Sequence, residues 1–179
     1  CSGNNLADNV VSFNGGNVSV QNPADLLENM SASFHAPGDS VECAITVSNL
    51  GTIDAVLDSF TLGDSNLTYH SALRDDPGFD ENDSTQVAAA AADEGLFASN
   101  INYTLVYGEN DDYEGETPGT NFTLNGNDTY DIANAIPAGE SRDFLLTIEY
   151  VNDPSSPQTL PANDVAISGF NAVFIYKQA

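Results

Sequence analysis

The sequence predicts an all-β fold: a jelly-roll-like antiparallel β-sandwich with a short helical insertion and an extended N-terminal strand. Many short segments alternate apolar with polar residues, which is the period of a strand with one buried face. Glycine and proline turns separate these segments, and one alanine-rich stretch interrupts them. With 179 residues, of which 41% are apolar, the chain can bury roughly 70% of its unfolded surface. We expect one sandwich domain over residues 12–179, preceded by a separate segment of residues 1–11.

The clearest strand is Ser40–Ser48, with the sequence SVECAITVS. It follows a turn at Pro37-Gly38-Asp39 and precedes another at Asn49–Thr52. Because successive side chains of a strand point to opposite faces, one face should carry Val41, Cys43, Ile45 and Val47. This strand should therefore bury one face and expose the other.

The other strands are assigned by the same alternation. Two short strands are expected around a glycine turn at Gly15-Gly16. A turn at Pro137–Glu140, much like Pro37-Gly38-Asp39, leads into another strong strand, and we expect these two similar turn-plus-strand units in opposing sheets. The remaining strands are expected at Met30–Phe34, Ile53–Leu62, 67–73, Ile101–Gly108, Arg142–Val151 and 166–178, with a hairpin signal at Asn125-Gly126.

One stretch, Thr85–Ala98, predicts a helix. It is rich in alanine and has only two β-branched residues, Thr85 and Val87. Asp83 or Ser84 would serve as the N-cap, and Gly95 lies near the expected end.

The charge of the chain is strongly negative. There are 27 acidic residues against three basic ones, Arg74, Arg142 and Lys177, for a net charge of −24. Nucleic acid is not expected as a partner, because binding phosphate needs clustered lysine and arginine. No run approaches the roughly 18 apolar residues of a membrane span, so none is expected. An acidic surface suits high salt, bound divalent cations or solubility, and composition does not choose among them.

Two acidic loops could hold a hard cation. They are RDDPGFDENDS (Arg74–Ser84) and ENDDYEGETPG (Glu109–Gly119). Ca²⁺ binds several carboxylate and carbonyl oxygens, which flexible loops supply. Neither loop matches the EF-hand pattern, and a solvated acidic loop is the alternative. The sequence implies no required cofactor, and the candidate calcium ligands are Asp75, Asp76, Asp80, Asp111, Asp112 and Glu114.

The cysteines and sequons point to an exported protein. The chain starts at Cys1 without methionine, which suggests a processed mature form. Cys1 and Cys43 are its two cysteines; they could pair within one chain or between neighbours, and Cys1 could instead be lipidated. N-linked glycans are expected, since seven Asn-X-Ser/Thr sequons occur, at Asn17, Asn29, Asn66, Asn82, Asn102, Asn121 and Asn127.

The stretch APGDSVECAITVSNLGTIDAVL resembles the TasA/camelysin family of secreted jelly-roll proteins. In that family a Pro-Gly-Asp turn leads into a strand and then an Asn-x-Gly-[Ser/Thr] turn. The matching residues here are Pro37, Gly38, Asp39, Asn49, Gly51 and Thr52. VSFNGGNVSV upstream, and AGESRDFLLTIEY and FNAVFIYKQA downstream, are similar to the family's early and late strands, so the resemblance spans nearly the whole chain.

The family includes bacterial biofilm-matrix fibres and archaeal bundling pili. The resemblance therefore implies an extracellular structural subunit, at the cell surface or in a biofilm matrix. Its partners would be identical subunits in a filament, and neighbouring filaments in bundles. Assembly would be head-to-tail by donor-strand complementation. Residues 1–11 would be the donor segment, and the side chains that fill the groove would come from Leu6, Val10, Val11 and Phe13.

No motif for catalysis is present, so we expect no enzymatic activity. The two histidines, His35 and His70, do not lie in His-Glu-x-x-His, and no Gly-x-Ser-x-Gly elbow occurs. The alternative to a filament subunit is a cell-surface adhesion or binding module, with or without calcium, because one sandwich fold hosts both roles.

Overall fold

The computed structural model describes residues 2–4, 12–14, 17–21, 24–62, 68–109, 111–116, 118, 128–131, 135–151 and 159–178. Within them, it describes the side chains of residues 32–55, 68–109, 111–116, 118, 135–151 and 159–169. The described chain is mostly antiparallel β-structure with one α-helix, as the sequence predicts at this coarser level.

The strands form two antiparallel sheets. The first sheet has the order β1 (Ser2–Asn4), β5 (Ser40–Ser48), β11 (Ser141–Tyr150) and β8 (Ile101–Tyr107). The path of the second is β10 (Ala135–Ile136), β6 (Ala55–Leu62), β12 (Val165–Gln178), β4 (Ala24–Phe34) and β2 (Ser12–Asn14). Three strands join it off this path: β3 (Asn17–Gln21) on β4, β7 (Thr68–Ser71) on β12, and β9 (Asp128–Asp131) on β6.

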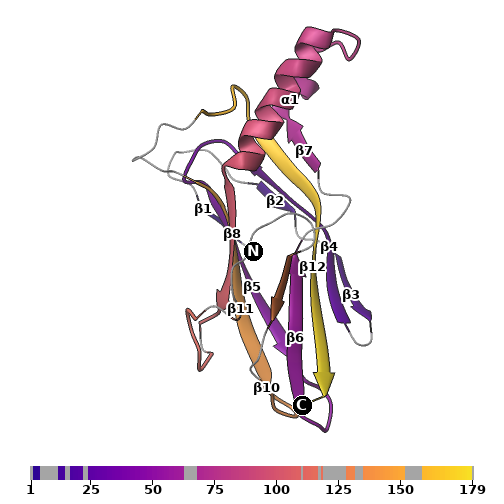
Figure 1. Cartoon of the computed structure of the whole chain (residues 1–179), viewed down its shortest axis with the longest axis vertical. Coiled ribbons are helices and arrows are strands. Elements are labelled where there is room, and N and C mark those ends of the chain that lie inside the picture. The colour runs from indigo at the N-terminus through magenta and orange to yellow at the C-terminus, as the bar shows by residue number, and fades with distance from the viewer. Residues whose placement is uncertain are drawn as a thin grey trace.

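The two sheets run along the long axis of the molecule, and the helix projects beyond one end (Figure 1). A short 3₁₀ helix, η1 (Ala72–Asp75), follows β7, and α1 (Ser84–Ser99) comes next in the chain. The C-terminus lies at the end opposite to α1 (Figure 1).

One hydrophobic core joins the two sheets and α1. The alternation of β5 buries Val41, Cys43 and Val47 as predicted, and Ile45 packs against the same core although it is partly exposed. Burying apolar area of this kind is the main stabilising term of the fold. The other buried members are Ala32 and Phe34 from β4, Phe97 from α1, Tyr103, Leu105 and Tyr107 from β8, Ile136, Phe144, Leu146, Ile148 and Tyr150 from β10 and β11, and Val165 and Ile167 from β12.

The helix closes one end of this core. Asp83 is its N-cap and accepts a hydrogen bond from the Thr85 N–H, as predicted. The helix continues past Gly95 to Ser99. The buried ring of Phe97 lies 5.1 Å from the Tyr150 ring and 5.6 Å from the Phe34 ring, so it contacts both sheets.

The two similar turn-plus-strand units are neighbours in one sheet, so their expected placement in opposing sheets is wrong. β5 and β11 pair over nine residue pairs, from Ser40–Glu149 to Ser48–Ser141. Both strands alternate apolar with polar residues and turn their apolar faces into one core. Alternation reports which face is buried but not which sheet the strand joins, so the pattern was compatible with either placement.

The two short strands expected around Gly15-Gly16 are present as β2 and β3, and the two glycines lie outside the described residues. β2 and β3 both pair with β4 and are not partners of each other. Of these strands, the two that are consecutive in the chain and pair with each other are β3 and β4, with Gln21 opposite Ala24.

Candidate functional site

The edge of the first sheet at β5 is only partly covered. β1 pairs with β5 at three positions, Ser2–Glu42, Gly3–Val41 and Asn4–Ser40. No other described strand lies on that side of β5, so the stretch from Ala44 to Ser48 has a described partner only on β11. Unpaired N–H and C=O groups along a strand edge are a template for another strand.

A disulfide lies at this edge. Cys43 is disulfide-bonded, and only 2% of its surface is exposed, since its side chain faces the core. On β11 its partner is Leu146, so the other sulfur approaches from elsewhere. The chain contains one other cysteine, Cys1, which lies outside the described residues. Ser2, next to Cys1 in the sequence, pairs with Glu42, next to Cys43.

The predicted donor segment is described only in part. Leu6, Val10 and Val11 lie outside the described residues. Phe13 belongs to β2 and pairs with Ala32 of the same chain. Residues 2–4 and 12–14 therefore pair with different sheets of their own chain, β5 in the first and β4 in the second. Donation of residues 1–11 to another subunit stays a prediction.

The opposite edge of the same sheet is β8. The loop after it returns to the strand end, where the Tyr107 N–H donates to the Glu116 carbonyl and the Gly115 N–H donates to the Tyr107 carbonyl. Elsewhere along this edge, no strand of the described chain pairs with the outer side of β8. The exposed sequon residue Asn102 lies on this strand, opposite Glu149 of β11. A glycan there would lie beside the edge.

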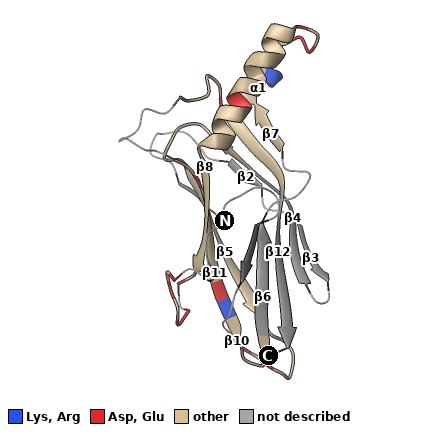
Figure 2. Ribbon diagram, viewed as in Figure 1, with Lys and Arg blue, Asp and Glu red and all other residues tan. Residues whose placement is uncertain are grey.

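The first acidic loop holds its carboxylates with its own hydrogen bonds. Asp76 accepts from the Gly78 N–H, and Asp80 accepts from the N–H and the side-chain amide of Asn82. The bonds from Asn82 lower the pKa of the Asp80 carboxyl. Asp75 contacts His70 at 3.1 Å. Asp75, Asp76 and Asp80 are exposed, and acidic residues mark the loop at the tip of α1 in Figure 2.

An arginine anchors this loop to the helix. The Arg74 guanidinium donates to both carboxylate oxygens of Glu94, at 2.6 and 3.1 Å, and lies over the Phe79 ring. The hydrogen bond from Arg74 is the main reason why the pKa of Glu94 is lowered. Glu94 also accepts from the Ser71 N–H, so one carboxylate joins β7, η1 and α1.

The second acidic loop is organised by Arg142. The Asp111 side chain is 2% exposed and lies 3.6 Å from the Arg142 guanidinium, which also lies over the Tyr113 ring. Asp111 accepts from the Tyr113 and Asp143 N–H groups as well. Asp112 and Glu114 point outward on this loop. Asp111 is therefore occupied by the arginine and two amides.

Calcium binding stays a prediction. Among the described residues, no three His, Cys, Asp or Glu side chains are grouped closely enough to hold a metal ion. A solvated loop stiffened by its own hydrogen bonds accounts for the positions of these carboxylates.

A polar cluster that the sequence analysis missed lies where α1 meets β12. Asp93, 4% exposed, accepts from the Ser71 hydroxyl, the Ala162 N–H and the Asn163 amide. The only signal for it was an acidic residue on the helix face that carries Phe97, four positions later.

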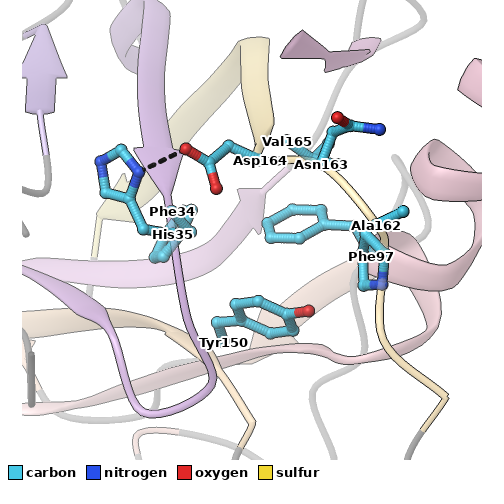
Figure 3. A pocket seen from close by; sticks show the side chains of 9 residues that line it. Phe34, His35, Phe97, Tyr150, Ala162, Asn163, Asp164 and Val165 are labelled. Carbon is cyan, nitrogen blue, oxygen red and sulfur yellow. Dashed lines mark hydrogen bonds and ion pairs between the residues drawn. The ribbon is translucent and has the colours of Figure 1, made fainter. Parts of the chain in front are cut away.

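Beside Asp93 lies a cavity of about 90 Å³, shown in Figure 3. His35 Nδ1 lies 2.6 Å from Asp164 Oδ2 at its wall, and Tyr150 lines it. Burial, and then the negative charges of Asp164 and Asp93, raise the pKa of Tyr150. His35, which stands beside a turn, is thus a partly buried residue that links the end of β4 to Asp164, just before β12.

The predicted glycosylation sites fall into three groups. Asn82 and Asn102 are exposed. Asn17 and Asn29 lie in β3 and β4, where only the backbone is described. The remaining three, Asn66, Asn121 and Asn127, lie outside the described residues.

A groove of about 320 Å³ lies on the first sheet, lined in part by Glu42, Thr46, Glu109 and Asp143. The Thr46 hydroxyl donates to Asp143 across it. Its lining carries three carboxylates and no arginine or lysine. Such a groove favours cations or hydroxyl-bearing ligands and disfavours anions.

No helix in the described part of the chain is both long and apolar enough to cross a membrane. Comparison with protein-family models, with curated proteins and with solved structures found no match.

Proposed function

We propose that this chain is the structural subunit of an extracellular filament, a pilus or biofilm-matrix fibre that assembles head-to-tail by donor-strand complementation. Its fold in this proposal is a jelly-roll-like β-sandwich formed by the two sheets. The proposal includes no enzymatic activity. It begins from the resemblance of the Pro37–Thr52 region to TasA/camelysin-like proteins and is supported by the geometry of β5.

Within the described residues, β5 is fully paired along one side and only partly along the other, and this observation carries the proposal. Nine of its residues pair with β11, and three, Ser40–Glu42, pair with β1 on the other side. The N-terminal strand of another copy, seated on that side in place of β1, would gain backbone hydrogen bonds to β5 and would place alternate side chains beside the core. The same contact repeated from one copy to the next does not close on itself, so it generates a filament.

The acidic surface sets a condition on how such filaments would bundle. Acidic residues cover the loop at the tip of α1 and the loop beside β11 (Figure 2). At a net charge of −24, copies repel one another at low salt, and screening shortens that repulsion to about 8 Å at physiological ionic strength. Bundling of neighbouring filaments would therefore require salt, a divalent cation or glycan contacts.

The test is negative-stain electron microscopy of the purified native protein beside a variant that lacks residues 1–11. We expect filaments in the full-length sample and monomers in the truncated one, because the donor is gone. A second variant, Leu6→Asp/Val10→Asp, keeps the length and removes the apolar side chains, so it should also fail to polymerise. Monodisperse monomers in the full-length sample at both low and molar salt would refute the proposal.

The second candidate is a cell-surface adhesion module, and the acidic groove favours it. Glu42, Glu109 and Asp143 line a hollow whose negative charge would attract a cationic or hydroxyl-bearing ligand. Isothermal titration with calcium, alone and with neutral oligosaccharides, distinguishes the two. Binding that is lost in Asp143→Asn, by a protein that stays monomeric, would favour adhesion over the filament.

A further inference from the structure

The disulfide at Cys43 bears on which chain supplies β1, the strand that pairs with β5 beside it. Cys43 is 2% exposed and faces the core, so a cysteine that merely touches the surface of the protein does not reach its sulfur. Leu146 of β11 occupies the neighbouring position on one side. On the other side of β5 lies β1, and its register places Ser2 opposite Glu42, so the residue before Ser2 in the sequence is the next one along toward Cys43.

The strand on that side has few contacts of its own. β1 pairs at three positions, and its sequence, Ser-Gly-Asn, offers no large apolar side chain. Glycine weakens a strand interior, since it loses more conformational freedom and packs nothing. Backbone pairing over three residues therefore holds β1 weakly, and the covalent bond is what would make its seating permanent.

We propose that Cys43 is bonded to Cys1 of whichever chain supplies β1, so that strand exchange turns an intrachain disulfide into an intersubunit one and seals the filament covalently. The inference rests on the proposed function and extends it. Exchange reuses the same β1–β5 contact between copies, as in domain swapping. The seal would offset the repulsion between subunits that each carry a charge of −24.

The chemistry requires an oxidant. The two thiols lose two protons and two electrons as the S–S bond forms, and a small-molecule disulfide such as oxidised glutathione accepts the electrons and protons, becoming two thiols. Once the intrachain bond exists, the thiolate of reduced glutathione attacks it, which leaves glutathione bonded to Cys1 and frees the Cys43 thiolate. The Cys43 thiolate of one opened chain then attacks the Cys1 sulfur of another and releases the glutathione thiolate, so exchange needs no further oxidant. An oxidising compartment keeps the product.

The first test uses the native protein. Filaments are alkylated with N-ethylmaleimide to stop exchange and are separated by electrophoresis in detergent with and without reductant. We expect a ladder of covalent multimers without reductant and a single 18.8 kDa chain with it. Filaments that are visible by microscopy but run only as monomers without reductant would overturn the inference and leave the proposed function standing. Absence of filaments at any salt would overturn both.

The second test mixes two variants that cannot close an intrachain bond. Cys1→Ser and Cys43→Ala carry tags of different mass, and each is checked for folding by circular dichroism before mixing with oxidised glutathione. We expect a covalent heterodimer in the mixture, and none when the double variant replaces either partner. Folded variants that give no heterodimer while still forming mixed filaments would overturn the inference. So would an intact mass of the reduced native chain that shows a lipid on Cys1.

Discussion

The molecule builds the same turn twice, at Ala36–Asp39 and at Pro137–Glu140. In each, the N–H of the fourth residue donates to the carbonyl of the first at 3.0 Å, and a glycine with positive φ is third, Gly38 at 97° and Gly139 at 81°. A type II turn requires that conformation, which glycine adopts without strain. Each turn leads directly into one of the paired strands, β5 or β11.

The bonds around the two turns also correspond. The Gly38 N–H donates to the Tyr150 carbonyl and the Tyr150 N–H returns to Asp39. In the other unit the Gly139 N–H donates to the Asn49 carbonyl and the Asn49 N–H returns to Glu140. The turn before β5 is thus bonded to the end of β11, and the turn before β11 is bonded to the residue that follows β5. β5 and β11 are therefore related by an approximate two-fold axis.

The turns differ in one side chain. Asp39 is fully buried, and its Oδ2 accepts from the N–H groups of His35 and Ala36. Glu140, at the corresponding position, is exposed. The shorter acid reaches back to its own turn, whereas the longer one extends into solvent. Glycine therefore determines the backbone conformation of both turns. Of the two acids, we expect only the buried one, Asp39, to contribute to stability.

The largest expected effect comes from Asp39→Ala. Two partly buried N–H groups would lose their acceptor, which should lower the free energy of unfolding by about 3 kcal/mol. Asp39→Asn keeps one oxygen and should lose less. Urea unfolding followed by circular dichroism measures both, provided that the slope m is unchanged. An Asp39→Ala midpoint equal to that of the native protein would mean that the two turns do not differ.

A smaller loss is expected from Asn49→Ala. The Asn49 side chain accepts from the Gly51 N–H and donates to the carbonyls of Ile53 and Ile136, so it joins the turn after β5 to β10. Removing it should cost about 1 to 2 kcal/mol, because the site is only partly buried. The same urea experiment applies. No loss at all would show that the backbone bonds fasten this end without the side chain.

Gly38→Ala and Gly139→Ala should each cost about 1 kcal/mol, since alanine is strained at positive φ. At Gly139 nothing lies within 4 Å of an added Cβ, so the cost there is conformational alone. Equal losses in thermal unfolding would confirm that both units depend on glycine in the same way. A much larger loss at Gly38 would show that its surroundings tolerate no added methyl group.

The smallest effect is expected from Glu140→Ala, which serves as the control for Asp39→Ala. The side chain is exposed, and a surface substitution of this kind usually changes stability by less than about 0.5 kcal/mol. A melting temperature within error of the native protein is the expected result. A loss as large as that of Asp39→Ala would remove the distinction between the two acids.

The sequence predicted where strands and the helix lie better than it predicted which strands pair with one another. The alternation gave the bounds of β5, and the cap at Asp83 gave the start of α1, because both signals depend on residues close in the chain. The pairing of β5 with β11 and of β2 with β4 depends on residues far apart, which no local pattern encodes.

The candidate sites show the same division. Asp111 was predicted as a calcium ligand because its loop is rich in acidic residues. In the structure its partner is Arg142, which is distant in the sequence. Asp93 gave almost no sequence signal because the groups that it accepts from lie on β7 and before β12. The role of a carboxylate depends on which hydrogen-bond donors the fold brings to it. The amino-acid composition gives the number of carboxylates but does not show which donors lie near each of them.

The central pair of strands also determines how the protein would respond to mechanical tension. A pull along the axes of β5 and β11 loads their nine residue pairs together, in shear, so the ladder must yield as one unit. The turn bonds at Tyr150 and Asn49 close both ends, so rupture has no frayed end from which to begin. The protein should therefore be stiffest along the direction of these two strands.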